Sequence, residues 1–181
     1  MLIAIADFCK PGSEYIRGRV LFSQSNNKYV RVDIKLVGVP IGIHGIHVHE
    51  KPINFRLNKD FCSQAKSHFN GSVPLWSPKT LGGTPHGSYM FNTERHIGDL
   101  CNNILSEDGT VDFSYDDKLI SLVPKHPNCI IGRSIVIHED GDDEGMFFSS
   151  FFEEPNLKFY TESKITGNAG KRIACANILR L

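Results

Sequence analysis

Three histidines stand within nine residues in the stretch GIHGIHVHE, residues 42–50. In a β-strand, side chains two residues apart project from the same face, so His47 and His49 would point side by side. Adjacent imidazoles are natural ligands for a borderline metal such as copper or zinc. Alone, the pair is equally compatible with histidines that pack in a core or lie exposed, so the metal interpretation needs further ligands.

Further candidate ligands follow downstream. They are His68 in SHFNG, His86 in TPHGS, His96 with Asp99 in RHIGDL, and His138 at the end of GRSIVIHE. Most of them occupy predicted loops or strand ends, where ligands can converge while the strands supply rigidity. Together with the pair in residues 42–50 they are too many for one tetrahedral site, so the sequence predicts two metal ions.

The segments that must position these residues have the pattern of β-strands. They are rich in β-branched residues and partly alternate apolar with polar: residues 2–8, 15–22, 29–39, 42–50, 110–117, 119–123, 132–139 and 172–181. Their short spacing leaves no room for crossover helices, which predicts antiparallel pairing. Two long irregular stretches, 51–103 and 140–171, contain no evident amphipathic helix. We therefore expect an all-β sandwich or barrel with two long functional loops.

Length and composition narrow the function classes. The 181 residues suit a single domain spanning residues 1–181. Twenty acidic residues balance twenty basic ones, so no net charge attracts nucleic acid or an anionic membrane. The apolar stretches are too short to span a bilayer. The N-terminal MLIAIADFCK lacks the basic region of a signal peptide, so we expect a cytoplasmic protein.

A series of longer motifs carries a family resemblance. GIHGIHVHE, CSQAKSHFN, ERHIGDL, CIIGRSIVIHE and TGNAGKRIAC, in that order, resemble the copper–zinc superoxide dismutases, and the resemblance covers nearly the whole chain. It implies an eight-stranded antiparallel Greek-key barrel or sandwich. It also implies an antioxidant oxidoreductase, which converts superoxide to dioxygen and hydrogen peroxide at a copper ion that alternates between two oxidation states.

The resemblance assigns the candidate ligands to two metals. Copper would be held by His47, His49, His68 and His138, and zinc by His68, His86, His96 and Asp99. His68 would then be the shared ligand, an imidazolate that bridges both ions. Three histidines and one carboxylate suit a closed tetrahedral zinc site. An all-imidazole site suits copper in both oxidation states.

The resemblance also implies roles outside the ligand sets. Arg172 matches the arginine that guides the substrate, since a fixed guanidinium can attract and hold a small anion. Asp142 fits the carboxylate that joins one copper ligand and one zinc ligand through their free N–H groups. Cys62 and Cys175 match the intrachain disulfide of the family. The chain's five scattered cysteines, without a CxxC pair, would otherwise predict free thiols.

The family is usually a homodimer, and the segment CIIG places Ile131 and Gly132 in the expected interface. The resemblance also allows a copper-loading chaperone as a further partner.

Three departures from the family pattern qualify these expectations. The insertion GSVPLWSPKTLGGTP makes His86 the least directly matched ligand. The phenylalanine-rich insertion 146–161 either packs as a lid or contacts a partner, and we expect packing. Ile165 stands where the family commonly has a steering lysine, which predicts a shallower dependence of rate on ionic strength.

The chief alternative is a catalytically inactive relative, either a copper-binding decoy or a metallochaperone-like domain. Such relatives tend to lose copper ligands or the guiding arginine, and this chain keeps both. A metallochaperone would also need a CxxC transfer motif, which the sequence lacks. A third alternative is a binding protein that uses the insertion 146–161 while its metals are purely structural. Metal analysis combined with a superoxide-consumption assay separates these functions.

Overall fold

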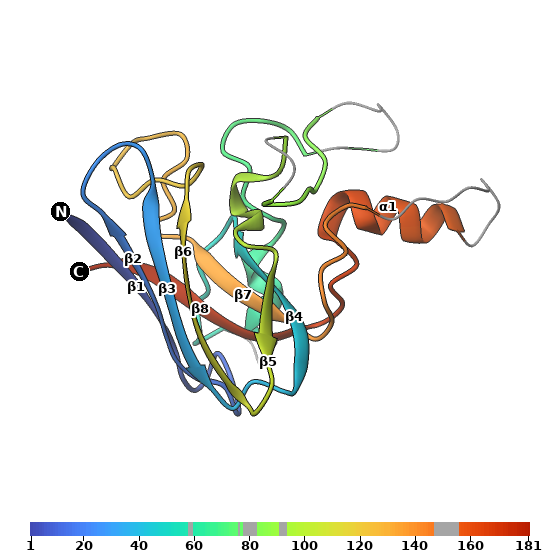
Figure 1. Ribbon diagram of the computed structural model, residues 1–181, viewed down its shortest axis with the longest axis horizontal. Coiled ribbons are helices and arrows are strands. Elements are labelled where there is room, and N and C mark those ends of the chain that lie inside the picture. The colour runs from blue at the N-terminus through green and yellow to red at the C-terminus, as the bar shows by residue number, and fades with distance from the viewer. Residues whose placement is uncertain (58–59, 76, 78–82, 91–93, 147–155) are drawn as a thin grey trace.

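Eight β-strands organise the part of the chain that the computed structural model describes, which is residues 1–181 apart from 58–59, 76, 78–82, 91–93 and 147–155. The strands are β1 (Leu2–Phe8), β2 (Arg17–Gln24), β3 (Val30–Val37), β4 (Gly42–His49), β5 (Asn103–Ser106), β6 (Thr110–Asp117), β7 (Ser134–His138) and β8 (Arg172–Arg180). They pair antiparallel in the order β5-β4-β7-β8-β1-β2-β3-β6. The edge strands β5 and β6 meet, so the sheet curls into a nearly closed barrel (Figure 1). The expected all-β antiparallel fold is confirmed.

Alternation of apolar and polar residues explains most of the strands. In β3, the residues at even positions from Val30 to Leu36 are buried in the barrel, and the intervening residues face outward. Strand β7 is different, because all five of its residues are buried. Ile135 and Ile137 face the barrel core, while Val136 packs on the outer side against the cysteines of a disulfide. A strand covered on both faces reads as a continuous apolar run.

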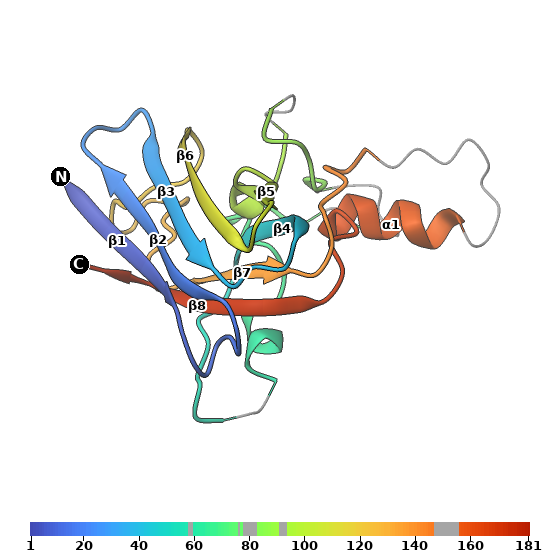
Figure 2. The same cartoon turned by 60° about the horizontal axis from the view of Figure 1, so that its bottom comes forward.

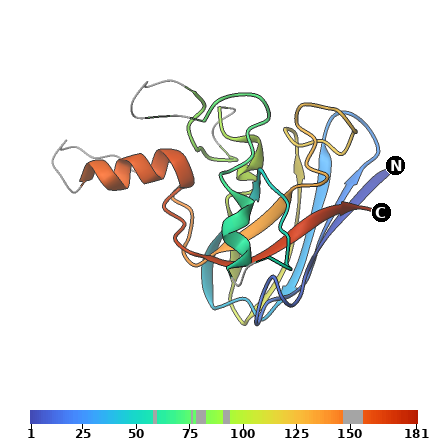
Figure 3. The same ribbon diagram turned by 180° about the vertical axis from the view of Figure 1, so that it is seen from behind.

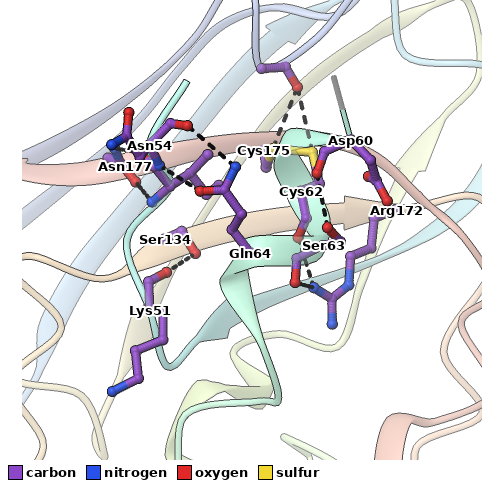
Figure 4. Close-up of a disulfide and its surroundings, with 12 residues drawn as sticks. Lys51, Asn54, Asp60, Cys62, Ser63, Gln64, Ser134, Arg172, Cys175 and Asn177 are labelled. Atoms are coloured by element: carbon purple, nitrogen blue, oxygen red, sulfur yellow. Dashed lines mark hydrogen bonds between the residues drawn. A yellow bond between two sulfur atoms is a disulfide. The ribbon is translucent and has the colours of Figure 1, made fainter. Parts of the chain in front are cut away.

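The disulfide joins Cys62 to Cys175 (Figure 4), which confirms the pairing that the resemblance implied. Cys62 lies in the short 3-10 helix η1 (Phe61–Ala65), and Cys175 lies in β8. The bond therefore ties the first long loop to the barrel. A second 3-10 helix, η2 (Ile97–Asp99), lies near the end of the same loop.

Two expectations about strands were wrong. Residues 119–123 do not form a strand, although Ile120 and Leu122 are buried. Their backbone N–H groups donate instead to side chains, that of Ile120 to Asp117 Oδ1 and that of Leu122 to Gln24 Oε1. Apolar side chains can thus enter the core without a strand when side-chain acceptors satisfy the backbone. The second error is an omission, because β5 was not among the predicted strands and begins at the last residue of the predicted irregular stretch 51–103.

The second long loop contains an α-helix, which the sequence analysis did not predict. Helix α1 (Asn156–Thr166) projects from the barrel (Figures 2 and 3) and ends at Gly167, whose φ of 69° suits a glycine after a helix. Its apolar residues do not gather on one face, so the sequence lacks a helical period. No helix among the described residues is long and apolar enough to cross a membrane. Four phenylalanines of the insertion 146–161, at positions 147, 148, 151 and 152, lie outside the described residues, while Phe159 in α1 is exposed rather than packed in a core.

Candidate metal centre

Strands β4 and β7 carry three of the predicted ligands on the outer face of the barrel. Ile46 and Val48 point into the barrel core, so the alternate positions His47 and His49 point outward, beneath the long loops. His138 ends β7, the neighbour of β4 in the sheet. His68 reaches the same place from the first loop, where it forms an isolated bridge with His49. All four rings are buried.

These four histidines form what we call the strand-side cluster. Their candidate donor atoms lie within 4.8 Å of one another. One nitrogen of each ring has a fixed partner: His47 Nε2 contacts Asp142 Oδ2 (2.7 Å), His49 Nδ1 contacts Lys66 O (2.8 Å), His68 Nδ1 contacts Asp99 Oδ1 (2.9 Å) and His138 Nδ1 contacts Gly170 O (3.2 Å). The other nitrogen of each ring is buried with no hydrogen-bond partner among the described residues. Buried polar atoms without partners are rare, so four in one place indicate a ligand, and their chemistry fits copper.

Burial lowers the pKa of three histidines in this cluster. It holds the pKa of His49 and His68 well below the usual value for histidine, with further lowering by neighbouring imidazoles. It also lowers the pKa of His138 to about 3. These rings are therefore neutral near pH 7, and each keeps a lone pair that a metal ion can use.

A second group, the loop-side cluster, consists of His68, His86, His96 and Asp99. The Nδ1 atoms of the three histidines lie 2.9, 2.9 and 3.1 Å from Asp99 Oδ1, in that order. Ligands bound tetrahedrally to zinc at its usual bond lengths would be about 3.3 Å apart, so the spacing fits that ion. Asp99 is fixed by its own helix, because its Oδ2 accepts a hydrogen bond from the backbone N–H of His96 (2.9 Å).

The loop-side cluster is strongly charged. Burial by itself would raise the pKa of Asp99, but His86 and His96 hold it well below its usual range, so the carboxylate is anionic. Burial would likewise lower the pKa of His86, yet Asp99 and Asp142 raise it to about 10. The lengthened loop therefore still brings His86 into the cluster. There, the two carboxylates favour a positive charge at its imidazole.

Asp142 joins the two clusters. Its carboxylate lies 2.7 Å from His47 Nε2 and 2.8 Å from His86 Nε2. Burial opposes its ionisation, but these two histidines lower its pKa further than burial raises it. Gly167 packs directly on this contact, because a Cβ at that position would lie 2.1 Å from Asp142 Oδ1 and 2.6 Å from His86 Nε2. The residue that follows helix α1 thus packs against the contact that joins the two clusters.

Arg172 lines one pocket together with histidines of the strand-side cluster. Figure 4 shows its guanidinium beside Cys62 and Ser63 of η1. Its Nη1 donates to Cys62 O at 2.7 Å, and its Nη2 donates to Lys66 O. The same Lys66 carbonyl contacts His49 Nδ1, so one peptide group positions both a candidate ligand and the guanidinium. A guanidinium has five N–H donors, which leaves others available for an anion.

A pocket of about 320 Å³ opens over these groups. It is lined by His49, Ser67, His68, His138, Glu162, Ile165, Thr166, Asn168, Gly170 and Arg172. Helix α1 thus forms one wall. Among these residues Arg172 carries a positive charge and Glu162 a negative one. Lys164 is not part of the lining, and its Nζ donates to Gly145 O.

Comparison with known proteins decides the family. The family model for copper/zinc superoxide dismutase (SODC) matches residues 16–178. Superoxide dismutase [Cu-Zn] A of Xenopus laevis is 36% identical over 167 residues, which cover 92% of this chain and 91% of that protein. The chain belongs to the copper/zinc superoxide dismutase family. A solved structure titled as the clock protein EA4 is 34% identical, with a TM-score of 0.73, and covers 99% of this chain and 94% of its own.

Membership of the superoxide dismutase family confirms the resemblance seen in the sequence and agrees with the buried histidine groups that could bind metal ions. Two residues at this centre were not predicted from the sequence, Asn102 and Asn103, which both contact Asp142. A signal was present, because asparagine is depleted in strands and yet opens β5. Of the residues predicted for a dimer interface, Ile131 is partly buried and Gly132 is exposed.

Proposed function

We propose that this member of the family is an active superoxide dismutase that holds copper at the strand-side cluster and zinc at the loop-side cluster. The observation that carries the proposal is the convergence of four buried, unpaired imidazole nitrogens beside a pocket that Arg172 lines. When bound, copper supplies one-electron redox chemistry. His68 presents Nε2 to one cluster and Nδ1 to the other, so it can serve both ions. Its Nε2 is also the atom at which the chain can hold a proton for the departing peroxide. Arg172 would hold the anionic substrate.

The test combines metal analysis with a superoxide-consumption assay. We expect one copper and one zinc per chain, together with turnover. Arg172→Ala should lower the rate roughly tenfold by removing local steering, without removing metal. Arg172→Lys keeps the charge without the forked donors. Lys171→Ala is the control: it removes an adjacent cation whose side chain is 85% exposed, and it should leave the rate unchanged. Copper without turnover, or no copper, would contradict the proposal.

The second candidate is an inactive copper-binding relative. The clock protein EA4, as its structure is titled, carries a name other than dismutase while sharing this fold. We favour the enzyme because each of the four strand-side nitrogens is positioned by a fixed partner on the opposite side of its ring. A binding protein has no need of a guanidinium in the pocket. Metal retention without superoxide consumption would select this second function.

We further propose that residues 1–181 act as one cytoplasmic domain that forms a homodimer through Ile131 and Gly132, and that a copper-loading chaperone delivers the metal. The exposed Gly132 supports the dimer, since a Cβ there would meet no atom within 4 Å and a partner surface could approach closely. Ile131→Asp should convert the dimer to a monomer in analytical ultracentrifugation. A wild-type protein that sediments as a monomer would contradict this part of the proposal.

A further inference from the structure

Asp142 joins the two clusters from a segment without strand or helix, between β7 and α1. Backbone hydrogen bonds to a neighbour fix the residues of a strand, whereas a loop residue needs other partners. The groups that hold Asp142 therefore decide whether its carboxylate can contact His47 and His86 at the same time.

The side-chain amide of Asn103 binds both backbone polar groups of Asp142. Its Oδ1 accepts a hydrogen bond from Asp142 N (2.7 Å), and its Nδ2 donates to Asp142 O (2.9 Å). Because a backbone N–H can only donate and a carbonyl can only accept, these contacts fix the orientation of the amide. Asn103 thus holds Asp142 as a paired strand would, with one bond to the peptide group on each side.

Asn103 is itself anchored to the strand that supplies His47. It opens β5, where it pairs with Gly45 of β4. Gly45 N also donates to Asp140 O (2.9 Å). The loop is therefore fastened to β4 and β5 at two points, Asp140 and Asp142, on the face that carries the metal ligands.

The neighbouring Asn102 acts differently. Its Nδ2 donates to Asp142 Oδ2 (3.0 Å) and lies 3.1 Å from Gly87 O, so it contacts the carboxylate itself and the segment after His86. The hydrogen bonds of Asn103 with Asp142 involve only backbone atoms of Asp142. Asn103 can influence the carboxylate only by deciding where it lies.

We propose that Asn103 is a positioning residue of the metal centre, which holds Asp142 against His47 and His86 and thereby slows the release of zinc. The inference rests on the proposed function, because it takes zinc to occupy the loop-side cluster. Without Asn103, Asp142 would shift and His86 Nε2 would lose the acceptor that orients its ring. Loss of a partner that orients a ligand typically costs 10–100-fold in metal affinity, and Asn103 acts one step further away, so we expect roughly a tenfold effect.

The experiment times zinc release to a chromogenic chelator from protein loaded with copper and zinc. Asn103→Leu removes both hydrogen bonds at similar size, and Asn103→Asp keeps an acceptor for Asp142 N but sets an oxygen against its carbonyl. Leu105→Ala is the matched control, on the same face of β5 and 57% exposed. We expect zinc release roughly tenfold faster from both Asn103 variants and unchanged in the control. The Cu(II) electron paramagnetic resonance spectrum should also change in the Asn103 variants, because His47 loses its acceptor.

Three results would overturn the inference while the wild type binds zinc and turns over superoxide. The first is wild-type zinc release from an Asn103 variant that circular dichroism shows to be folded. The second is faster release with an unchanged copper spectrum, and the third is equally fast release from Leu105→Ala; either of these two would mean general loosening. If Asn103→Leu does not fold, the size-matched Asn103→Asp decides the comparison. A wild-type protein that retains no zinc would contradict the proposed function first, and the inference with it.

Discussion

The two donor clusters are built from different kinds of structure. In the strand-side cluster, His47 and His49 lie in β4 and His138 ends β7. Pairing of β7 with β4 and β8 sets the positions of all three, His47 and His49 against β7 and His138 against Arg172 of β8. In the loop-side cluster no member lies in a strand, and only Asp99 lies in a helix, the three-residue η2. The sheet therefore preorganises one cluster, while the other depends on contacts between loops.

The difference extends in part to the groups that orient the rings. His49 and His138 each contact a backbone carbonyl, whereas His86 contacts the carboxylates of Asp99 and Asp142. His47 is the exception in the strand-side cluster, because it shares Asp142 with His86. A carboxylate on a loop is held only as well as its own partners hold it. We conclude that the arrangement of the loop-side cluster depends on its ion and on the contacts between the loops. The arrangement of the strand-side cluster depends mainly on the barrel.

The largest effect should come from cutting the covalent tether between the first loop and the barrel. Cys62 and Cys175 are separated by 113 positions, and a disulfide that closes a loop of that size stabilises a protein by about 4.7 kcal/mol in the chain-entropy model. We expect the double variant Cys62→Ala/Cys175→Ala to lose free energy of unfolding on that scale in urea titrations. Cys129→Ala, which removes a free thiol, is the control. A loss below about 1 kcal/mol would show that the loop is held without its tether.

Removing a loop-side ligand should disorder more of the chain than removing a strand-side ligand. Asp99→Ala should weaken zinc binding more than about 100-fold, beyond the effect of losing an outer partner, and should expose residues 51–103 to protease. His49→Ala should weaken copper binding while those residues stay protected. Equilibrium dialysis and limited proteolysis measure both effects, with His126→Ala, outside both clusters, as the control. Equal cleavage in the Asp99 and His49 variants would remove the distinction between the clusters.

Lys66 offers a smaller and opposite effect. It has a φ of 65° and a ψ of –144°, a conformation that costs a residue with a side chain roughly 1–3 kcal/mol. Glycine would avoid this cost but loses about 0.5–1 kcal/mol through the entropy of the unfolded chain. Lys66→Gly should therefore stabilise the protein by about 1 kcal/mol and leave copper content unchanged, because His49 and Arg172 contact the backbone carbonyl. Lys66→Ala, which keeps the strained backbone, should give no gain in thermal unfolding.

The smallest effect concerns the pocket wall. Ile165→Lys would add a second cation to a pocket lining that contains Arg172 and Glu162. We expect the rate at low salt to rise about threefold and to fall more steeply with ionic strength. Ile165→Gln, which is polar but uncharged, separates charge from shape. An unchanged salt dependence in Ile165→Lys would mean that this wall does not steer the substrate.

The same contrast explains what the sequence could predict. The side-by-side placement of His47 and His49 follows from the period of a strand, and so do most of the strand positions. The contribution of His86 could not be read from a period, because it depends on how a lengthened loop folds back. The residue types made His86 a candidate ligand, the family resemblance assigned it to zinc, and the structure brings it within 2.9 Å of Asp99.

The errors have physical causes as well. Residues 119–123 have the composition of a strand, but side chains of Asp117 and Gln24 bind their backbone. Helix α1 lacks an apolar face, so no periodicity indicated it. Asn103 contacts Asp142 across 39 positions of sequence, a distance over which local patterns carry no information.

Gly167 lies between the contact of Asp142 with His86 and the wall of the pocket. Its lack of a side chain lets the C-terminal end of helix α1 rest on the contact between Asp142 and His86, and the preceding Thr166 lines the pocket. A shift of Asp142 or His86 would therefore press on the end of α1 and on the pocket wall at Thr166. Under the proposed function, loss of zinc from the loop-side cluster would then also change the shape of the pocket through which superoxide reaches the strand-side cluster.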